Sequence, residues 1–133
     1  MALINWSEAF EVGIPEVDEQ HKKLVAIVNA LHEAMLKGQA RETMGKALEE
    51  VVDYTVYHFA TEERLFAEKQ YPRAAAHKHL HDELTATAKK LRADVASGKS
   101  VISHEVMRFL RDWLQQHIMS EDKAFGRFVR GGA

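Results

Sequence analysis

Residues 41–72 have the sequence RETMGKALEEVVDYTVYHFATEERLFAEKQYP, and this stretch decides the fold. Apolar side chains, with one threonine among them, recur here with the period of about 3.6 residues that is typical of a helix with one buried face. The positions are Met44, Leu48, Val51, Val52, Thr55, Phe59, Leu65 and Phe66. Tyr71 precedes Pro72, and the residue before a proline is disfavoured in a helix. We therefore expect one long helix over residues 41–70.

The same apolar period continues on both sides of this helix. It predicts three further helices, over residues 16–37, 72–97 and 103–126. Gly38 and Gly98 follow the ends of two of them, and glycine commonly terminates a helix. Pro72 fits the first turn of the third helix, and Ser100 or Ser103 can cap the fourth. Strands are not expected, because glycine and proline are few and the periodic stretches are long.

Short connections determine how the four helices pack. Because only a few residues separate consecutive helices, sequential neighbours should run antiparallel. We expect an all-α fold, an up-down-up-down antiparallel four-helix bundle with an irregular N-terminal lead. The chain has 133 residues, 46% of them hydrophobic, which is enough to bury the core of one domain spanning residues 1–133.

Composition excludes several classes of protein. The 18 basic and 20 acidic residues give a net charge of −2, so neither nucleic acid nor an anionic membrane surface is an expected partner. Cysteine is absent, which excludes disulfides, iron–sulfur clusters and thiolate zinc sites. The first residues do not have the pattern of a signal peptide, and no run of about 18 apolar residues could span a membrane. We expect a cytoplasmic protein without membrane insertion.

Five of the eight histidines and one glutamate lie in phase with the apolar positions, so they should point into the bundle. They are His21, His58, Glu62, His77, His81 and His117. Residues 58 and 62 are four apart, as are residues 77 and 81, and this spacing places each pair on one helix face. Positions equidistant from an antiparallel turn lie side by side. The midpoints of 21 and 58, of 62 and 77, and of 81 and 117 fall at the three connections, so all six side chains should meet at one level.

Such a cluster has a metal-binding interpretation and a structural one. A single inward histidine is more often a hydrogen-bonded core residue than a ligand. Burying five imidazoles and a carboxylate together without a cation would cost several kcal/mol for each uncompensated group, however, which favours a metal. Nitrogen and oxygen ligands without thiolate suit iron, manganese or zinc. The remaining histidines, His32, His79 and His104, lie too far along the bundle or face away from the cluster, and we expect them to be structural or solvated.

The number of histidines suggests two ions joined by carboxylates. Five are too many for one ordinary site that keeps an open position. Glu62 is one candidate bridge, and a second should come from the last helix near His117, where Glu121 and Asp122 both follow. Ideal α-helical geometry favours Glu121, and the pattern alone leaves the choice open.

The complete set of spacings resembles the hemerythrin family, and within it the single-domain bacterial hemerythrins. The resemblance is carried by His21, His58-Phe-Ala-Thr-Glu62, His77-Lys-His-Leu-His81 and His117-Ile-Met-Ser-Glu-Asp122, together with Val12-Gly13-Ile14 and Asp18-Glu-Gln-His21 in and after the lead. It implies that Asp122 is the second bridge. Because five residues turn an α-helix too far for this, we expect a local widening of the last helix, such as a π-bulge.

The resemblance also implies a cofactor and a function. It implies two iron ions (Fe²⁺/Fe³⁺) with a bridging oxo or hydroxo group, one held by His21 and His58 with an open position, the other by His77, His81 and His117. Dioxygen would bind reversibly at the open position, for oxygen transport, storage or delivery. The positions that line the oxygen pocket in hemerythrins are Leu24, Phe59, Trp113, Leu114 and Ile118, which equally fit ordinary bundle core.

Two other functions compete with oxygen binding. A di-iron oxidase or peroxidase on a ferritin-like bundle would use Glu-x-x-His motifs, and the sequence contains none. A role in oxygen or iron sensing would need a separate partner that carries the output. We therefore expect a protein that is not an enzyme, apart from weak peroxidase or oxidase side activity. We expect a monomer whose partner is dioxygen, with an oxygen-consuming protein as the candidate recipient.

Overall fold

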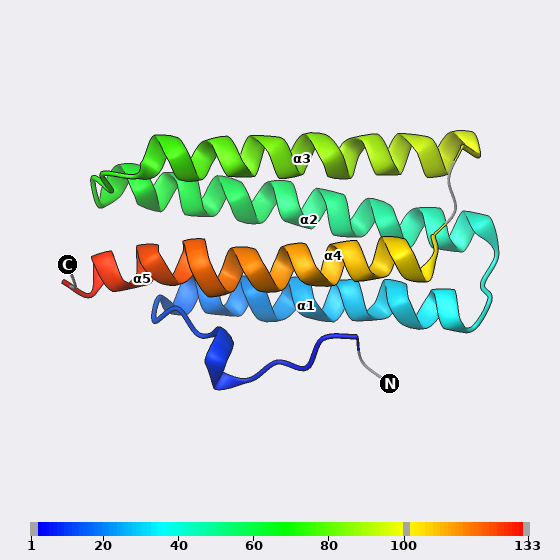
Figure 1. Cartoon of the computed structure of the whole chain (residues 1–133), viewed down its shortest axis with the longest axis horizontal. Helices are drawn as coiled ribbons and strands as arrows, with labels where there is room; N and C mark the ends of the chain where they lie inside the picture. Colours follow the sequence, from blue (N-terminus) through cyan, green and yellow to red (C-terminus); the bar gives the residue numbers. More distant parts are fainter. Residues whose placement is uncertain (1–2, 100–101, 132–133) are drawn as a thin grey trace.

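The computed structural model describes residues 3–99 and 102–131, without the side chains of Ile118 and Met119. Its helices are η1 (Glu8–Phe10), α1 (Pro15–Leu36), α2 (Arg41–Glu68), α3 (Ala74–Ser97), α4 (His104–Gln116), the π-helix η2 (His117–Asp122) and α5 (Lys123–Val129). Figure 1 shows α4, η2 and α5 as one continuous rod, so four rods form the bundle. The described residues contain no strand. The expected all-α four-helix bundle is confirmed.

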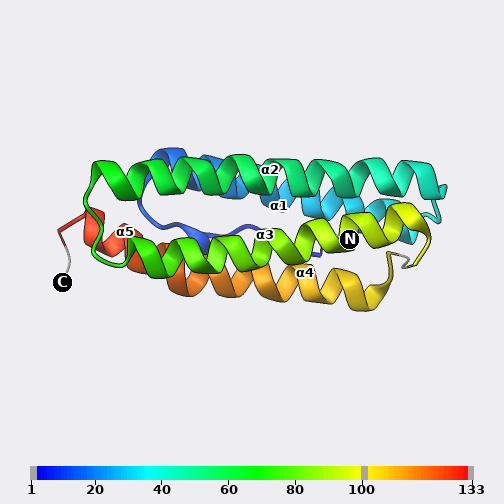
Figure 2. The ribbon, with the colours of Figure 1, turned by 90° about the horizontal axis from the view of Figure 1, so that it is seen from above.

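The rods alternate in direction along the chain. In sequence order, α2 packs against α1 on one side and against α3 on the other, and α4 also contacts α1. Figure 2 shows the same four rods from above, and Figure 1 shows the N-terminal lead running along one side of the bundle, next to α1. Ile4 in this lead is buried and exchanges two hydrogen bonds with Asn29 of α1: its N–H donates to Oδ1 (2.9 Å) and its carbonyl accepts from Nδ2 (2.8 Å).

The observed helix ends differ from the expected ranges by a few residues. The second helix ends at Glu68 rather than residue 70, and the third begins at Ala74 rather than residue 72. Gln70 has a φ of 53°, in the left-handed region, which breaks the helix before Pro72 is reached. Pro72 therefore lies in the turn and not in the first turn of α3. At the start of α4, Ser103 Oγ accepts a hydrogen bond from the N–H of Val106 (3.3 Å). Ser100, the alternative cap, lies outside the described residues.

The two glycines that were expected to end helices do so. Gly38 and Gly98 have φ values of 65° and 84°, in the left-handed region where a side chain would be strained. The connections that follow are short, so α1 turns back into α2 and α3 into α4. This places the inward faces of all four rods at matching levels.

The N-terminal lead is fastened over one end of the bundle. Asp18 accepts hydrogen bonds from the N–H groups of Val12 (2.8 Å) and Gly13 (3.2 Å), and Arg130 donates to the carbonyl of Val12. Gly126 of α5 lies directly against that same carbonyl, and a Cβ there would overlap it. Helix η1 also contacts η2. The lead therefore covers the rod that contains the π-helix.

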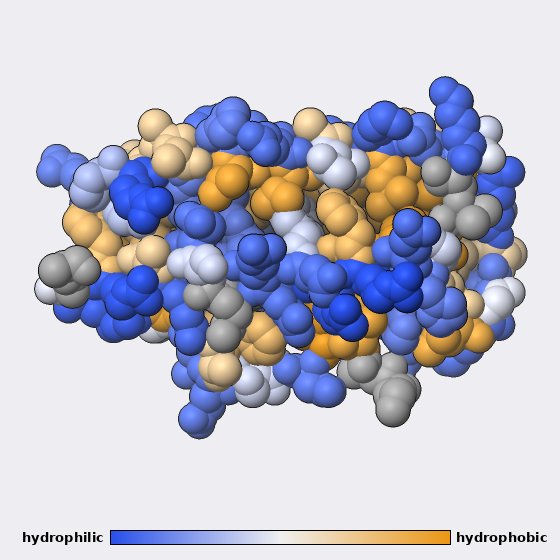
Figure 3. Space-filling view, in the orientation of Figure 1, coloured by the Kyte–Doolittle hydropathy of each residue, from blue (hydrophilic) through white to orange (hydrophobic). Residues whose placement is uncertain are grey.

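The surface is mostly polar on the face drawn in Figure 3, where hydrophobic residues show between hydrophilic ones in separate patches. Among the described residues, none of the helices has the combination of length and apolar character that a bilayer crossing requires.

We predict that Gly126→Ala lowers the free energy of unfolding by about 1–3 kcal/mol, because the new Cβ forces the backbone of Val12 away from α5. Gly45→Ala in α2 is the matched control, since its Cβ meets open space and should raise the free energy of unfolding by up to about 1 kcal/mol. Chemical denaturation of both variants measures the two values. Equal effects would show that the lead does not pack against α5 in solution.

Candidate metal centre

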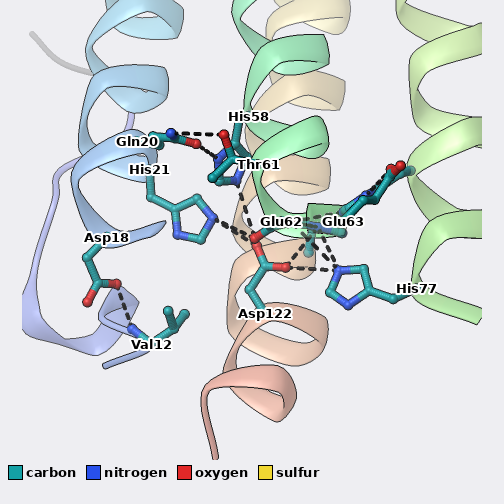
Figure 4. Close-up of polar contacts among 12 residues, drawn as sticks. Val12, Asp18, Gln20, His21, His58, Thr61, Glu62, Glu63, His77 and Asp122 are labelled. Carbon is teal, nitrogen blue, oxygen red and sulfur yellow. Dashed lines mark hydrogen bonds and ion pairs between the residues drawn. The ribbon is translucent and has the colours of Figure 1, made fainter. Parts of the chain in front are cut away.

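Seven ionisable side chains from all four rods meet in the core near the end of the bundle where α2 passes into α3. None is more than 6% exposed, and most are completely buried. They are His21 of α1, His58 and Glu62 of α2, His77 and His81 of α3, and His117 and Asp122 of η2. Figure 4 shows Glu62 and Asp122 between His21 and His58 on one side and His77 on the other. The five histidines that were expected at one level of the bundle therefore lie together.

Glu62 divides the histidines into two groups. Its Oε2 lies 3.4 Å from Nε2 of His58 and 3.6 Å from Nε2 of His21. Its Oε1 faces the other three Nε2 atoms. These distances are 2.9 Å to His81, 3.8 Å to His117 and 3.9 Å to His77. One carboxylate thus has one oxygen toward a pair of imidazoles and the other toward a trio.

Asp122 repeats this division from the opposite rod. Its Oδ2 lies 2.8 Å from Nε2 of His21, and its Oδ1 lies 3.0 Å from Nε2 of His77 and 3.1 Å from Nε2 of His117. Two groups of ligand-type atoms result, and within each group all the atoms lie within 4.8 Å of one another. Glu62 and Asp122 belong to both groups. The arrangement has the form of two adjacent metal positions that share two carboxylates.

The π-helix explains why Asp122 and not Glu121 joins the cluster. In a regular α-helix, the residue four positions after His117 would share its face, which favoured Glu121. In a π-helix the hydrogen bonds run from residue i to i+5, so Asp122 lies one turn after His117. Asp122 is completely buried, whereas Glu121 is partly exposed. The expected widening of the last helix is confirmed, and the choice that ideal α-helical geometry favoured is wrong.

The buried polar atoms of the cluster are better placed to bind a metal than to form hydrogen bonds with one another. Nε2 of His21, His58 and His81 and all four carboxylate oxygens of Glu62 and Asp122 are buried and have no hydrogen-bond partner among the described residues. Native proteins rarely leave buried polar atoms in this condition. The atoms are close but are not oriented for hydrogen bonds, because their lone pairs converge on shared points, as ligands of a cation do.

The carboxylates hold protons on two of the histidines. Burial alone would lower the pKa of His21, but the nearby carboxylates of Asp122 and Glu62 outweigh burial and raise it to about 9. Burial would likewise lower the pKa of His117, but the same carboxylates outweigh burial and raise this pKa to about 10. Burial would raise the pKa of Glu62, but the histidines around it lower this pKa well below its usual value. The histidines and carboxylates of the cluster thus favour one another's charged forms.

Outer hydrogen bonds orient two of the imidazoles. Nδ1–H of His58 donates to Oε1 of Gln20 (2.7 Å), whose Nε2 donates to the hydroxyl of Thr61 (3.2 Å). Nδ1–H of His81 donates to Oε2 of Glu63 (3.0 Å), and a carboxylate can only accept. With the proton on Nδ1, the lone pair on Nε2 points into the cluster.

Gln20 and Glu63 were missed in the sequence, although a signal was present. The midpoint of residues 20 and 58 lies in the same connection as that of residues 21 and 58. The midpoint of residues 63 and 81 lies at Pro72. Equal distance from a turn therefore predicts that Gln20 lies beside His58 and that Glu63 lies beside His81.

The proposed oxygen-pocket positions lie near the cluster with different degrees of burial. The ring of Phe59 stacks on that of His81, with centroids 3.8 Å apart and planes within 5°. Leu24 and Leu114 are completely buried, whereas Trp113 is partly buried with its ring edge toward Phe59. The side chain of Ile118 lies outside the described residues. A groove of about 310 Å³ adjoins this region and is lined by Leu80, Glu83, Leu84, Trp113, Gln116, His117, Ser120 and Glu121. The pocket assignment stays a prediction.

The other three histidines do not join either group of ligand-type atoms. His79 is exposed and pairs with Glu83 on its own helix (2.6 Å). His104 is exposed at the start of α4, and His32 is partly buried on α1. All three fall outside the cluster, as the sequence predicted.

Comparison with known proteins gives a consistent result. Residues 12–129 match the family model described as the hemerythrin HHE cation binding domain. A bacteriohemerythrin of Stenotrophomonas maltophilia is 38% identical over 130 residues, covering 98% of this chain and 84% of that protein. A bacteriohemerythrin of Methylococcus capsulatus is 38% identical over 127 residues, covering 95% and 96%. A crystal structure of a wild-type hemerythrin superposes with a TM-score of 0.90 at 37% identity, covering 94% and 96%.

We predict that His77→Ala lowers metal affinity at least about tenfold, because it removes one nitrogen from the three-histidine group. His79→Ala is the matched control, two residues away on the same helix with an exposed side chain, and it should retain the full metal content. Elemental analysis of both purified variants measures the result. Equal metal content in the two would contradict the assignment of His77.

We also predict a pH dependence for the metal-free protein. The pKa values of His21 and His117 rise from 6.5 to about 9 and about 10, so the stabilisation they provide is complete below about pH 6.5 and is lost as the pH rises through those values. Because the pKa of Glu62 is lowered, the stabilisation that its carboxylate provides is present above about pH 4.5 and is lost in acid. The melting temperature of metal-free protein should therefore be highest between about pH 4.5 and 6.5 and fall toward pH 9.5.

Metal-loaded protein provides the control, because bound imidazoles carry no extra proton and its melting temperature should change much less above pH 6.5. Circular dichroism melts across this range test both forms. Parallel pH profiles for the two forms would show that the carboxylates do not hold protons on the histidines.

Proposed function

The chain belongs to the hemerythrin family, and we propose that it binds dioxygen reversibly at a non-haem di-iron centre, for oxygen transport, storage or delivery. The observation that carries the proposal is the unequal division of five histidines by two shared carboxylates. Because both halves share Glu62 and Asp122, the half with two histidines has one protein ligand fewer. A position for an exogenous ligand follows from that count.

The residues fit two iron ions joined by an oxo or hydroxo group. His21 and His58 would hold one ion and His77, His81 and His117 the other, with Glu62 and Asp122 bridging both. When bound, the pair of ions supplies the electrons that dioxygen takes up and returns. Histidine-rich ligation with only two carboxylates gives the site little negative charge, which disfavours the high-valent iron that an oxidase needs.

The surrounding side chains keep water away from the centre. Leu24, Phe59 and Leu114 are buried beside the histidines, and Phe66 packs on the ring of His77 with centroids 4.6 Å apart. The indole N–H of Trp113 is buried without a hydrogen-bond partner among the described residues, but an indole does not release its proton near neutral pH. This apolar wall favours the intact release of dioxygen over its reduction.

The similar proteins also weigh against the other candidate functions. The similar proteins carry the names bacteriohemerythrin and hemerythrin, and we infer that this chain is an oxygen-binding protein and not an enzyme. An oxidase or peroxidase, or a sensor that acts through a separate partner, is the alternative. The large exposed hydrophobic side chains of the described residues are spread over three helices, which supports a monomer. They are Leu36 of α1, Val56 and Tyr57 of α2, and Phe109 of α4. The absence of cysteine is compatible with the cytoplasm as its compartment.

We predict that the purified protein contains two iron ions per chain, one for each group of ligand-type atoms. After anaerobic reduction, alternate exposure to oxygen and argon should change the visible absorption spectrum reversibly over several cycles. Metal analysis and spectrophotometry measure both properties. Irreversible oxidation with release of peroxide at the first exposure would favour an oxidase, and zinc as the native metal would overturn the proposal.

A further inference from the structure

The two halves of the centre differ in the charge of the group that receives a hydrogen bond from a ligand histidine. On the two-histidine side, Nδ1–H of His58 donates to the neutral amide of Gln20 (2.7 Å). On the three-histidine side, Nδ1–H of His81 donates to the carboxylate of Glu63 (3.0 Å). The His58 contact is shorter by 0.3 Å, and only the His81 contact has a charged acceptor.

The Gln20 contact belongs to a wholly neutral and buried chain. Gln20 and Thr61 are 7% and 8% exposed. The amide nitrogen of Gln20 donates to the hydroxyl of Thr61 (3.2 Å), which donates to the main-chain carbonyl of Tyr57 (3.3 Å). This sequence of donors and acceptors fixes the amide orientation, so that the oxygen of Gln20 faces His58. No formal charge reaches His58 through it.

The Glu63 contact combines a charged acceptor with an apolar setting for the imidazole. The side chain of Glu63 is 29% exposed and remains in contact with solvent, whereas that of His81 is 1% exposed. The ring of His81 packs on Phe59 at 3.8 Å, and the ring of Phe66 lies 6.0 Å away. Low polarity around the imidazole strengthens its electrostatic coupling to the carboxylate.

A carboxylate that accepts from Nδ1–H makes the imidazole a stronger electron donor through Nε2. An amide in the same position does so less, because it carries no negative charge. Nε2 of His81 lies 2.9 Å from Oε1 of Glu62, inside the three-histidine group. A change in the donor strength of this nitrogen therefore affects the metal position of that group. The more electron-rich of the two metal positions stabilises the higher oxidation state.

We propose that Glu63 is a positioning residue that orients His81 and, through its charge, lowers the reduction potential of the three-histidine metal position relative to the two-histidine position. The inference rests on the proposed di-iron centre and adds an electronic asymmetry to its unequal ligand count. Glu62 and Glu63 are consecutive, so one turn of α2 supplies both the shared carboxylate and the outer acceptor.

The test exchanges charges while keeping hydrogen bonds. Glu63→Gln retains an oxygen that can accept from His81 and removes the negative charge. Gln20→Glu places a negative charge opposite His58. Anaerobic redox titration of the iron-loaded protein should give a more positive midpoint potential for Glu63→Gln and a more negative one for Gln20→Glu. Glu50→Gln is the control, an exposed residue of α2 about 18 Å along the helix from Glu62, and it should leave the potential unchanged.

A second measurement does not depend on iron or oxygen. In zinc-loaded protein, the proton on Nδ1 of His81 should resonate at lower field than in zinc-loaded Glu63→Gln, because its bond to a carboxylate is stronger than its bond to an amide. Nitrogen-edited proton spectra resolve this signal from those of the other imidazoles. Should Glu63→Gln fail to retain iron, this spectrum decides the question.

Two results would overturn the proposal: an unchanged potential in iron-loaded Glu63→Gln, or an Nδ1 proton of His81 that does not move in the zinc-loaded variant. Failure of the proposed function gives a different result. In that case the wild-type protein would not bind oxygen reversibly, while the potentials of the two variants would still shift in opposite directions.

Discussion

The structure depends on the polar contacts among seven ionisable side chains that the bundle removes from water. Isolated, each carboxylate or imidazolium in this core would destabilise the fold by several kcal/mol. Together they compensate one another, because Glu62 and Asp122 each lie within ion-pair distance of histidines from at least two rods. The short turns and the apolar faces are arranged so that all seven side chains reach one level. The cluster is therefore both the most costly part of the core and the part that fixes the register of its helices.

The fold and the convergence of the site could be predicted from the sequence because both follow from periodicity. An apolar period of about 3.6 residues specified four helices, and short turns specified their order and register. Family resemblance was needed where periodicity fails, at Asp122, since a regular α-helix would have selected Glu121. The predicted end of α2 was wrong for a similar reason. Gln70 takes a left-handed conformation, which the sequence predicts only where glycine or asparagine stands.

Polar residues that act through a histidine were harder to predict than the histidines. Gln20 and Glu63 match the levels of His58 and His81 across the turns, but a glutamine or glutamate on a helix usually faces solvent. Their roles appear only when the partner on the neighbouring rod is known. The same holds for Gly126, whose function is to leave room for the carbonyl of Val12, more than 100 residues earlier in the chain.

This contact between Val12 and the last helix also limits the order in which the molecule can be assembled. Ribosomes synthesise the lead first and α5 last, so the contact between Val12 and α5 cannot form until almost all of the domain has been made, although the lead can bond to α1 earlier. His117 and Asp122 likewise appear late, after the other five members of the cluster. During synthesis, an emerging chain can form the first three rods but holds an incomplete, highly polar core. Completion of the metal-binding cluster and closure of this end of the bundle must therefore be late, coupled events in the maturation of the protein.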